Sequence, residues 1–429
     1  MAIDAVLLGA GLRGRMVYGR WAREHADRLR IVAVAEPDDA RRAAVAREHG
    51  LEPANVARDW RELLSRPRLA DVAIVATSDT VHVEPALAAF AAGYHVLLEK
   101  PIAPDPADCL RVVEAAEATG RILQIGHVLR YAPFYVRVHE LIAAGRIGRV
   151  LGIDMQENVA FWHYAHSYVR GKFRNRRIAA PIVLAKTCHD LDLMIWLAGA
   201  APQRVASFGE RTLFRPEGAP SRDVPARCTD GCPVQADCPW DAVAFYATAD
   251  ESAARWWPLS DVSSDPSREA RRRALETGPY GVCVYRADND LPDRQVLAVE
   301  FANGVAATFT MNGTASDEKR TIHVAGSAGE LRGVLHEGWI EVRRHGAAGF
   351  ERIDVAGSPF DHFGGDPGLI EHFTTAVERG RPDEVRASGR VSLDSHLLGF
   401  AAEEARLSGR VVAVDEIRAA AAAAARARA

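Results

Sequence analysis

The stretch Gly9-Ala10-Gly11-Leu12-Arg13-Gly14 has the G-x-G-x-x-G spacing, and it decides how the first part of the chain is expected to fold. It follows an apolar run and precedes a helical pattern, the strand-turn-helix context that a dinucleotide-binding turn requires. The first glycine permits a tight turn, the second lets the backbone approach a pyrophosphate, and the third lets helix and strand pack. The predicted phosphate-binding residues are Gly9, Gly11, Leu12, Arg13 and Gly14.

Glu36 is the second feature of this predicted cofactor site. It closes the second strand, 22 residues after Gly14. A carboxylate at this place accepts hydrogen bonds from the adenosine ribose hydroxyls and repels a 2′-phosphate. The glycine turn and the acid together predict NAD as the preferred cofactor, and Arg13 leaves some NADP binding open. A bare turn between strand and helix, without a ligand, is the alternative interpretation.

The first 125 residues alternate short apolar runs with amphipathic stretches, a pattern typical of a parallel sheet wrapped by helices. The predicted strands are Ala5–Leu8, Arg30–Ala35, Val72–Ala76, His95–Leu98 and Ile122–Ile125. The predicted helices include Arg15–His25, Asp39–His49, Val81–Ala92 and Ala107–Thr119. We therefore expect an α/β fold whose residues 1–125 form a doubly wound Rossmann domain.

A different rhythm begins near residue 126 and continues to 417. Longer alternating strands are predicted at Val150–Val159, Gln295–Asn303, Val305–Met311 and Thr321–Ala325, which favours a second α/β domain with a large, mostly antiparallel open sheet. A segment rich in Pro, Asp, Arg and Cys interrupts this pattern at about 210–292 and is too long for an ordinary loop. Residues 418–429 contain only Ala and Arg, and we expect a frayed helix or a disordered tail.

Composition narrows the class of partner. The chain has 48% hydrophobic and 26% charged residues, a formal net charge of -4 and a pI near 6.4. Without a basic run, neither nucleic acid nor an anionic membrane surface is an expected partner. No signal-peptide pattern and no membrane-spanning run stands out, so we expect a cytoplasmic protein that binds a small molecule and keeps its six cysteines as thiols or metal ligands.

Four further segments carry a family resemblance: Val75–His82, Ala92–Pro101 (which ends Glu99-Lys100-Pro101), Gly145–Val150 and His189–Asp192. On these motifs the chain resembles the Gfo/Idh/MocA oxidoreductases, which include glucose-fructose oxidoreductase and inositol dehydrogenase. The resemblance implies a Rossmann domain followed by an α/β domain whose open sheet forms the floor of the substrate site and often an oligomer interface. A homo-oligomer, a dimer or a tetramer, is therefore expected. It also implies further cofactor-binding residues: Thr77, Asp79, His82, Glu99 and Lys100.

Lys100 and His189 are the predicted catalytic residues. Lys100 lies at the carboxyl end of a parallel strand, where such sheets bind their ligands, and the resemblance implies that it stands beside the nicotinamide and the reacting hydroxyl. His189 opens a helix, and its implied role is that of proton acceptor. The Lys100–Pro101 bond is a candidate cis peptide. The alternatives are a solvated lysine and a histidine that caps a helix.

The sequence departs from the family pattern just before His189. Many members carry an Asp four residues earlier, whereas this chain has Ala185, followed by Lys186. A cation there would lower the imidazole pKa, which favours the neutral form that accepts a proton. Lys186 is therefore a third candidate for the catalytic site, as a donor to a substrate oxygen or carboxylate.

Residues 161–175 crowd aromatic, histidine and cationic side chains together after a strand. Aromatic faces stack on sugar rings, and polar groups contact hydroxyls, so this segment is the predicted substrate loop; an oligomer contact is the alternative. Residues 362–366 form a second candidate wall or only a turn. The predicted substrate-binding residues are Arg130, Tyr131, Trp162, His163, His166, Arg170, Asn175, Lys186 and His189.

The cysteines of the insertion form a candidate metal site. Cys228, Cys232, Cys238 and Cys283 could close around a structural zinc ion, contributing folding free energy to a segment with few apolar residues. Unligated thiols and an iron-sulfur cluster remain as alternatives, because the spacing is not that of a standard zinc knuckle. Cys188 is a neighbour of His189 and a possible substrate contact, whereas Cys109 fits a helix core.

These residues predict an NAD-dependent oxidoreductase that removes hydride from a secondary hydroxyl of a sugar, glycoside or polyol. The alternative is an NAD-dependent glycosidase that oxidises a ring hydroxyl transiently, eliminates the aglycone, adds water and returns the hydride, with no net redox change. A third class, a non-catalytic NAD-sensing regulator, is disfavoured by the intact Glu99-Lys100-Pro101 and His189.

Overall fold

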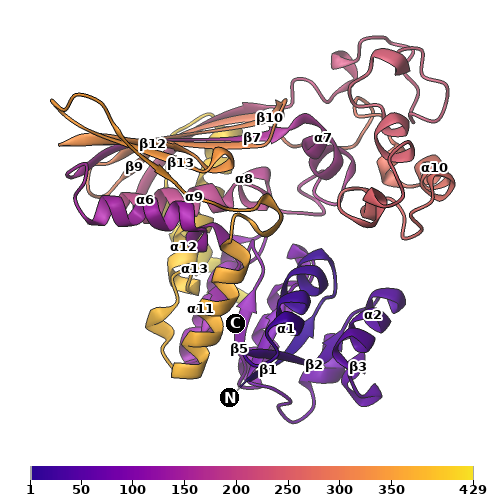
Figure 1. Ribbon diagram of the computed structural model, residues 1–429, viewed down its shortest axis with the longest axis horizontal. Helices are drawn as coiled ribbons and strands as arrows, with labels where there is room; N and C mark the ends of the chain where they lie inside the picture. The colour runs from indigo at the N-terminus through magenta and orange to yellow at the C-terminus, as the bar shows by residue number, and fades with distance from the viewer. Residues whose placement is uncertain (1, 429) are drawn as a thin grey trace.

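A computed structural model describes residues 2–428 (Figure 1). Within these residues, the first sheet has six parallel strands in the order β3-β2-β1-β4-β5-β6. The strands are β1 Ile3–Leu8, β2 Leu29–Ala35, β3 Val56–Ala57, β4 Val72–Val75, β5 His95–Leu98 and β6 Leu123–Ile125. The predicted doubly wound sheet is confirmed, and its strands are buried on both faces, as continuous apolar runs require.

The helices of this domain are η1 Leu12–Gly19, α1 Arg20–Glu24, α2 Asp39–His49, α3 Trp60–Leu64, α4 Val83–Ala91 and α5 Pro106–Thr119. The side chains of Asp38 and Asp105 accept backbone hydrogen bonds at the starts of α2 and α5, while Gly50 and Gly120 end these helices in the left-handed conformation. The segment predicted as one helix after the glycine turn begins as π-helix η1 and continues as α1.

The second sheet has nine strands in the described residues, in the order β14-β13-β12-β11-β7-β10-β9-β8-β15. Neighbouring strands are antiparallel except for the parallel pair β7 and β10, so the prediction of a mostly antiparallel sheet is confirmed. The strands are β7 Val150–Ala160, β8 Pro202–Glu210, β9 Arg294–Phe301, β10 Ala306–Ala315, β11 Lys319–Gly326, β12 Gly329–Val334, β13 Trp339–Arg344, β14 Glu351–Asp354 and β15 Val412–Ala413.

Helices α6 Pro133–Ala143 and α9 Cys188–Ala198 lie along one face of this sheet (Figure 1). Two short helices, α7 Phe161–Tyr164 and α8 Ile182–Ala185, stand near the end of β7 and before α9. Strands β7 and β13 of this sheet contact α9 and α6, and β11 alternates buried and less buried side chains, as expected for a sheet with one covered face. None of the helices in residues 2–428 combines the length and apolar character that a membrane-spanning helix needs.

The C-terminal helices tie the second domain back to the first. They are α11 Gly365–Arg379, α12 Gly389–Ser408 and α13 Val414–Arg428, and both α12 and α13 pack against α5. Residues 418–428 of the segment expected to be a frayed or disordered tail lie in α13, where Ala421 and Ala425 are buried and Arg428 forms an ion pair with Asp105 at 2.8 Å; residue 429 lies outside the described residues. Because alanine side chains are small, α13 can pack closely against α5.

The insertion lies between β8 and β9 and extends beyond α7 (Figure 1). It consists mainly of short helical turns and one longer helix, α10 Arg268–Thr277. It also has a small core of its own that includes Tyr246, Leu259 and Leu275. Apolar content in this segment therefore suffices for local packing.

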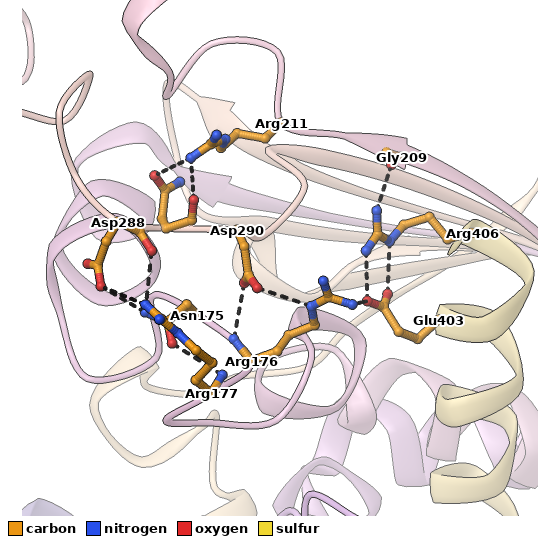
Figure 2. Close-up of polar contacts among 10 residues, drawn as sticks. Asn175, Arg176, Arg177, Gly209, Arg211, Asp288, Asp290, Glu403 and Arg406 are labelled. Carbon is orange, nitrogen blue, oxygen red and sulfur yellow. Dashed lines mark hydrogen bonds and ion pairs between the residues drawn. The ribbon is translucent and has the colours of Figure 1, made fainter. Parts of the chain in front are cut away.

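A polar network anchors the end of the insertion to the rest of the domain (Figure 2). The amide of Asn175 donates to the Asp288 carboxylate at 3.1 Å, and Arg176 pairs with Asp290 and Glu403, each at 3.2 Å. Arg406 pairs with Glu403 and donates to the Gly209 carbonyl at the end of β8. Four segments far apart in sequence are thus joined, mainly by charge-assisted hydrogen bonds.

Candidate functional site

The turn between β1 and η1 has the geometry of a phosphate cradle. Gly9 has a φ of +94°, and a Cβ there would lie 2.6 Å from the Ala76 carbonyl oxygen. A Cβ on Gly14 would lie 2.0 Å from the Gly9 carbonyl oxygen, whereas the space beside Gly11 is open to 4 Å. The close approaches at Gly9 and Gly14 fit the predicted tight turn, and the open space beside Gly11 would admit a pyrophosphate, whose binding here stays a prediction.

Glu36 is buried at the end of β2 against this turn. Its carboxylate accepts hydrogen bonds from the backbone N–H groups of Ala10, at 2.7 Å, and Asp38, at 3.0 Å. The guanidinium of Arg41 lies 3.1 Å from the same carboxylate. The predicted ribose-binding acid is therefore in place, with a cation beside it that sequence analysis missed.

Arg13 extends from the turn to the end of β5. Its Nε atom donates to Glu99 at 2.5 Å, and its Nη2 atom lies 2.8 Å from Asp366 at the start of α11. The Tyr18 hydroxyl also donates to Glu99, at 2.6 Å. Burial alone would raise the pKa of Glu99, but Arg13 and Tyr18 hold it below its usual value, so this carboxylate is ionised.

Lys100 follows Glu99 at the carboxyl end of β5. Its Nζ atom donates to the backbone carbonyl of Ala185 at 2.7 Å, across the boundary between the two domains. The Lys100–Pro101 bond is cis, as expected. The side chain of His82 lies behind it, with Nδ1 at 2.7 Å from the Pro101 carbonyl and Nε2 at 3.1 Å from the Thr77 carbonyl. Asp79 accepts from the Ala180 backbone N–H at 3.2 Å, so this pair of side chains supports the strand ends.

His189 lies in the first turn of α9 and is 7% exposed. Within residues 2–428 its Nδ1 atom has no hydrogen-bond partner. Burial lowers the pKa of His189 well below the usual 6.5, and the charge of Lys100 lowers it further. The imidazole is therefore neutral at neutral pH and able to accept a proton, as predicted, although Lys100 rather than Lys186 is the main cation involved.

A second histidine, His127, lies behind His189 and was missed by sequence analysis. The two ring centroids are 5.9 Å apart, and His127 forms an ion pair with Asp192 at 3.0 Å. Burial opposes its protonation, but Asp192 raises the pKa of His127 to about 9. The sequence signal that could have identified His127 is its position just after strand β6.

Two predicted substrate-binding residues are buried close to this histidine. Arg130 pairs with Asp192 at 2.5 Å, and the Tyr131 hydroxyl donates to Gln124 at 3.2 Å.

Lys186 belongs to a buried charge cluster on the sheet floor. Its Nζ atom lies 3.1 Å from Glu157 on β7, and Arg320 on β11 contacts both Glu157, at 2.5 Å, and Asp190, at 3.0 Å. Burial and the neighbouring Glu157 raise the pKa of Asp190 well above its usual value, whereas Arg320 and Lys186 outweigh burial and hold the pKa of Glu157 below its usual value. Sequence analysis found only Lys186, because its partners lie on distant strands.

The predicted substrate loop divides into two sets of residues. Trp162 and His163 are partly exposed, and His163 contacts Glu318 at 2.5 Å. Burial lowers the pKa of His163 to about 4, with a further contribution from Lys186. Three others are buried against the insertion: His166 contacts the Tyr246 hydroxyl, Arg170 donates to the Val282 and Trp240 carbonyls, and Asn175 donates to Asp288.

Residues 362–366 also face the site. His362 pairs with Asp366 at 2.8 Å, and its ring lies 6.3 Å from that of His189. His362 and Phe363 have positive φ angles of 51° and 58°, a costly conformation for residues other than glycine. Whether these residues form a second wall of the substrate site stays a prediction.

The four cysteines of the insertion line one cavity of about 10 Å³. An isolated β-bridge between Arg227 and Val282 brings Cys283 alongside Cys228, and Arg170 donates to the Cys228 sulfur at 3.6 Å. In residues 2–428 no disulfide forms, and no group of three or more His, Cys, Asp or Glu side chains has the arrangement of a metal site. Cys109 is buried in α5, as expected, and Cys188 is buried beside His189.

Two family models match the chain. One, described as the NAD-binding Rossmann fold of an oxidoreductase family, covers residues 3–127, and the other, the C-terminal alpha/beta domain of that family, covers residues 139–388. The chain belongs to the Gfo/Idh/MocA oxidoreductase family. The resemblance seen in the sequence is therefore confirmed, as is an NAD-binding Rossmann domain.

The similarity to individual proteins is limited in sequence identity or in coverage. The Bacillus subtilis (strain 168) protein called "Putative oxidoreductase YteT" is 27% identical over 84% of this chain and 86% of its own length. Inositol 2-dehydrogenase 2 of Saccharopolyspora erythraea is 33% identical over 46% of this chain, which spans only 55% of that relative. Among solved structures, levoglucosan dehydrogenase in complex with NADH and levoglucosan has a TM-score of 0.69 at 17% identity, over 96% of this chain and 100% of that one. At this identity the likeness shows the fold alone.

Exchanging Glu36 for alanine tests the cofactor assignment. We expect the parent protein to bind NAD more tightly than NADP, and Glu36→Ala to narrow the gap by roughly tenfold, because the ribose acceptor is lost while Arg41 can pair with a 2′-phosphate. Calorimetric titration with both cofactors measures this. Glu24→Ala, which removes an exposed carboxylate, is the matched control. Equal affinities of the parent for NAD and NADP would contradict the assignment.

Proposed function

We propose that this protein is an NAD-dependent dehydrogenase that oxidises a secondary hydroxyl of a sugar, glycoside or polyol. One observation carries the proposal. At the carboxyl end of the Rossmann sheet, the Lys100 ammonium is fixed on the Ala185 carbonyl, and burial together with the Lys100 charge lowers the pKa of His189, so that this imidazole is neutral. Ligands of open α/β sheets bind at this end. The names of relatives, inositol 2-dehydrogenase and levoglucosan dehydrogenase, support the substrate class.

His189 and Lys100 have separate roles in the proposed proton transfer. NAD, which the Gly9–Gly14 turn and Glu36 would hold, would supply the acceptor for the hydride of the carbinol carbon. Neutral His189 accepts the hydroxyl proton, and Lys100, which has two N–H bonds beyond the one given to Ala185, donates to the oxygen as it becomes a carbonyl. One C–H bond and one O–H bond break, and a C=O double bond forms, so atoms and electrons balance.

The remaining predicted residues take four kinds of role in this proposal. Trp162, His163 and Lys186 face the substrate, while Thr77 and Glu99 line the cofactor side. Asp79 and His82 position the strand ends through their backbone contacts. The buried side chains that hold the domain and the insertion in place act on the substrate only indirectly; they are Arg130, Tyr131, His166, Arg170 and Asn175.

We further propose that the cysteine cluster binds a structural zinc ion. The four thiols already line one small cavity, and burial raises the pKa of Cys238 and Cys283, so that a cation must displace their protons. Because Zn–S bonds are about 2.3 Å long, the cysteines have to draw together around the ion. Zinc would then fix the insertion against the Arg170 side chain.

We also propose that the protein is a homo-oligomer, a dimer or a tetramer. Large apolar side chains are exposed on strands of the second sheet, Leu151 on β7 and Phe208 on β8. Exposed apolar residues on a sheet favour burial against a second copy.

A panel of inositols, methyl glycosides and free sugars, followed by NADH absorbance, tests the dehydrogenase proposal. We expect stoichiometric NADH with at least one of them. Lys100→Met should lower turnover about 10²- to 10⁴-fold with little change in NAD affinity, since the glycine turn holds the pyrophosphate. Lys319→Met, at a partly exposed lysine that pairs with Glu337, is the matched control. Release of an aglycone without NADH would favour the glycosidase instead, and near-normal turnover of Lys100→Met would contradict the role of Lys100.

The pH dependence of kcat/KM tests the role of His189. Because the pKa of His189 is lowered, protonation should abolish its acceptor role only below pH 6.5, so the acid limb of the profile lies below this value. His189→Ala should lower turnover and remove that limb, whereas His345→Ala, at an exposed histidine, should leave it in place. An acid limb at or above pH 6.5 in the parent protein would exclude the buried neutral imidazole as the base.

Elemental analysis of protein purified without added metal tests the zinc proposal. We expect about one zinc per chain, and its loss in Cys228→Ser and Cys283→Ser together with a lower melting temperature. Cys109→Ala, which alters a cysteine outside the cluster, should retain the metal. A folded parent protein that contains no metal would show that the four cysteines are ordinary thiols.

A further inference from the structure

Four ring side chains form what we call the aromatic wall: Trp162 and His163 of α7, and Phe245 and Trp257 of the insertion. Trp162 is stacked on Phe245 with ring centroids 5.8 Å apart, and it is tilted against Trp257 at 5.6 Å. His163 meets the Trp257 ring edge-on at 4.8 Å. The insertion thus contributes half of a surface that begins on the predicted substrate loop.

The aromatic wall adjoins the candidate catalytic site. His163 contacts Glu318 at 2.5 Å. Burial lowers the pKa of His163, whereas burial would raise the pKa of Glu318 and the His163 hydrogen bond lowers it; the charge of Lys186 lowers both pKa values further. Lys186 directly follows Ala185, whose carbonyl oxygen binds Lys100. Lys186 also pairs with Glu157 on β7, and β7 runs directly into α7, which carries Trp162 and His163. The wall therefore begins where the strand beside the reacting groups ends.

The wall differs from the packed rings next to it. His166 and Tyr246, which join the same loop to the insertion, are each 1% exposed and bonded to one another. The four members of the wall are only partly buried, and Trp256 beside them is 59% exposed. Large rings left partly open next to a polar, charged site are typical of carbohydrate-binding surfaces, because a sugar ring offers an apolar face and hydroxyl edges together.

We propose that the aromatic wall is a second subsite that binds a pyranose ring, so that the substrate is a glycoside of at least two sugar rings. The reacting ring lies at Lys100 and His189, and the next ring stacks on the wall, with Lys186 and Glu318 as partners for its hydroxyls. This inference rests on the proposed function. It assigns the insertion a role in selecting the substrate.

Binding to the NAD-loaded Lys100→Met protein tests the subsite separately from turnover. The probes are methyl β-glucoside with cellobiose, and methyl β-galactoside with lactose, each pair titrated calorimetrically. We expect the disaccharide of at least one pair to bind about threefold to tenfold more tightly, the range of one aromatic stacking contact. Adding Phe245→Ala should remove this preference. Phe350→Ala, at an exposed aromatic residue outside the wall, is the matched control and should retain it.

The outcomes separate the two proposals. Equal affinities within both pairs, absence of sugar binding, or a preference that survives Phe245→Ala and Trp257→Ala would overturn the subsite. An equal loss of affinity for both members of a pair would show that these rings only support the fold. Failure of the parent protein to reduce NAD with any sugar would overturn the dehydrogenase instead, whatever the affinities.

Discussion

Arg13 places one guanidinium between two buried carboxylates, Glu99 at the end of β5 and Asp366 at the start of α11. The rest of the site depends on this interaction. Removing one member of a buried ion pair costs about 3–5 kcal/mol, because a charge is left without compensation. Arg13 also lies in the glycine turn, so the same side chain aligns the phosphate cradle, the strand that carries Lys100 and a helix of the second domain.

Two buried histidines, whose ring centroids lie 5.9 Å apart, differ in their protonation state. His127 is paired with Asp192 and is protonated, whereas burial and the Lys100 charge keep His189 neutral. One fold thus holds an imidazolium and an imidazole side by side at neutral pH. Only the neutral ring can act as a base, and the charged one behind it further disfavours its protonation.

Local sequence patterns predicted those structural features that depend on interactions between residues close together in the sequence. The glycine turn, the buried strands of the first sheet and α2 follow from steric limits, continuous apolar runs and capping residues within a few positions. The partners of the predicted site residues could not be found this way. Asp366 contacts Arg13, Glu157 contacts Lys186, and Arg320 in turn contacts Glu157, all across long sequence separations, and no short-range signal marks such pairs. The same holds for the buried orientation of Arg170 and Asn175, which only the folded insertion defines.

The crystal structure of the protein with NAD tests the central claim, that hydride acceptor and acid-base pair meet across the domain boundary. The account predicts the pyrophosphate on the backbone around Gly11 and the nicotinamide ring beside Lys100 and His189, with room for a carbinol carbon about 3–3.5 Å from the ring. A nicotinamide ring bound away from both side chains, or one that displaces Arg13 from Glu99 and Asp366, would contradict it.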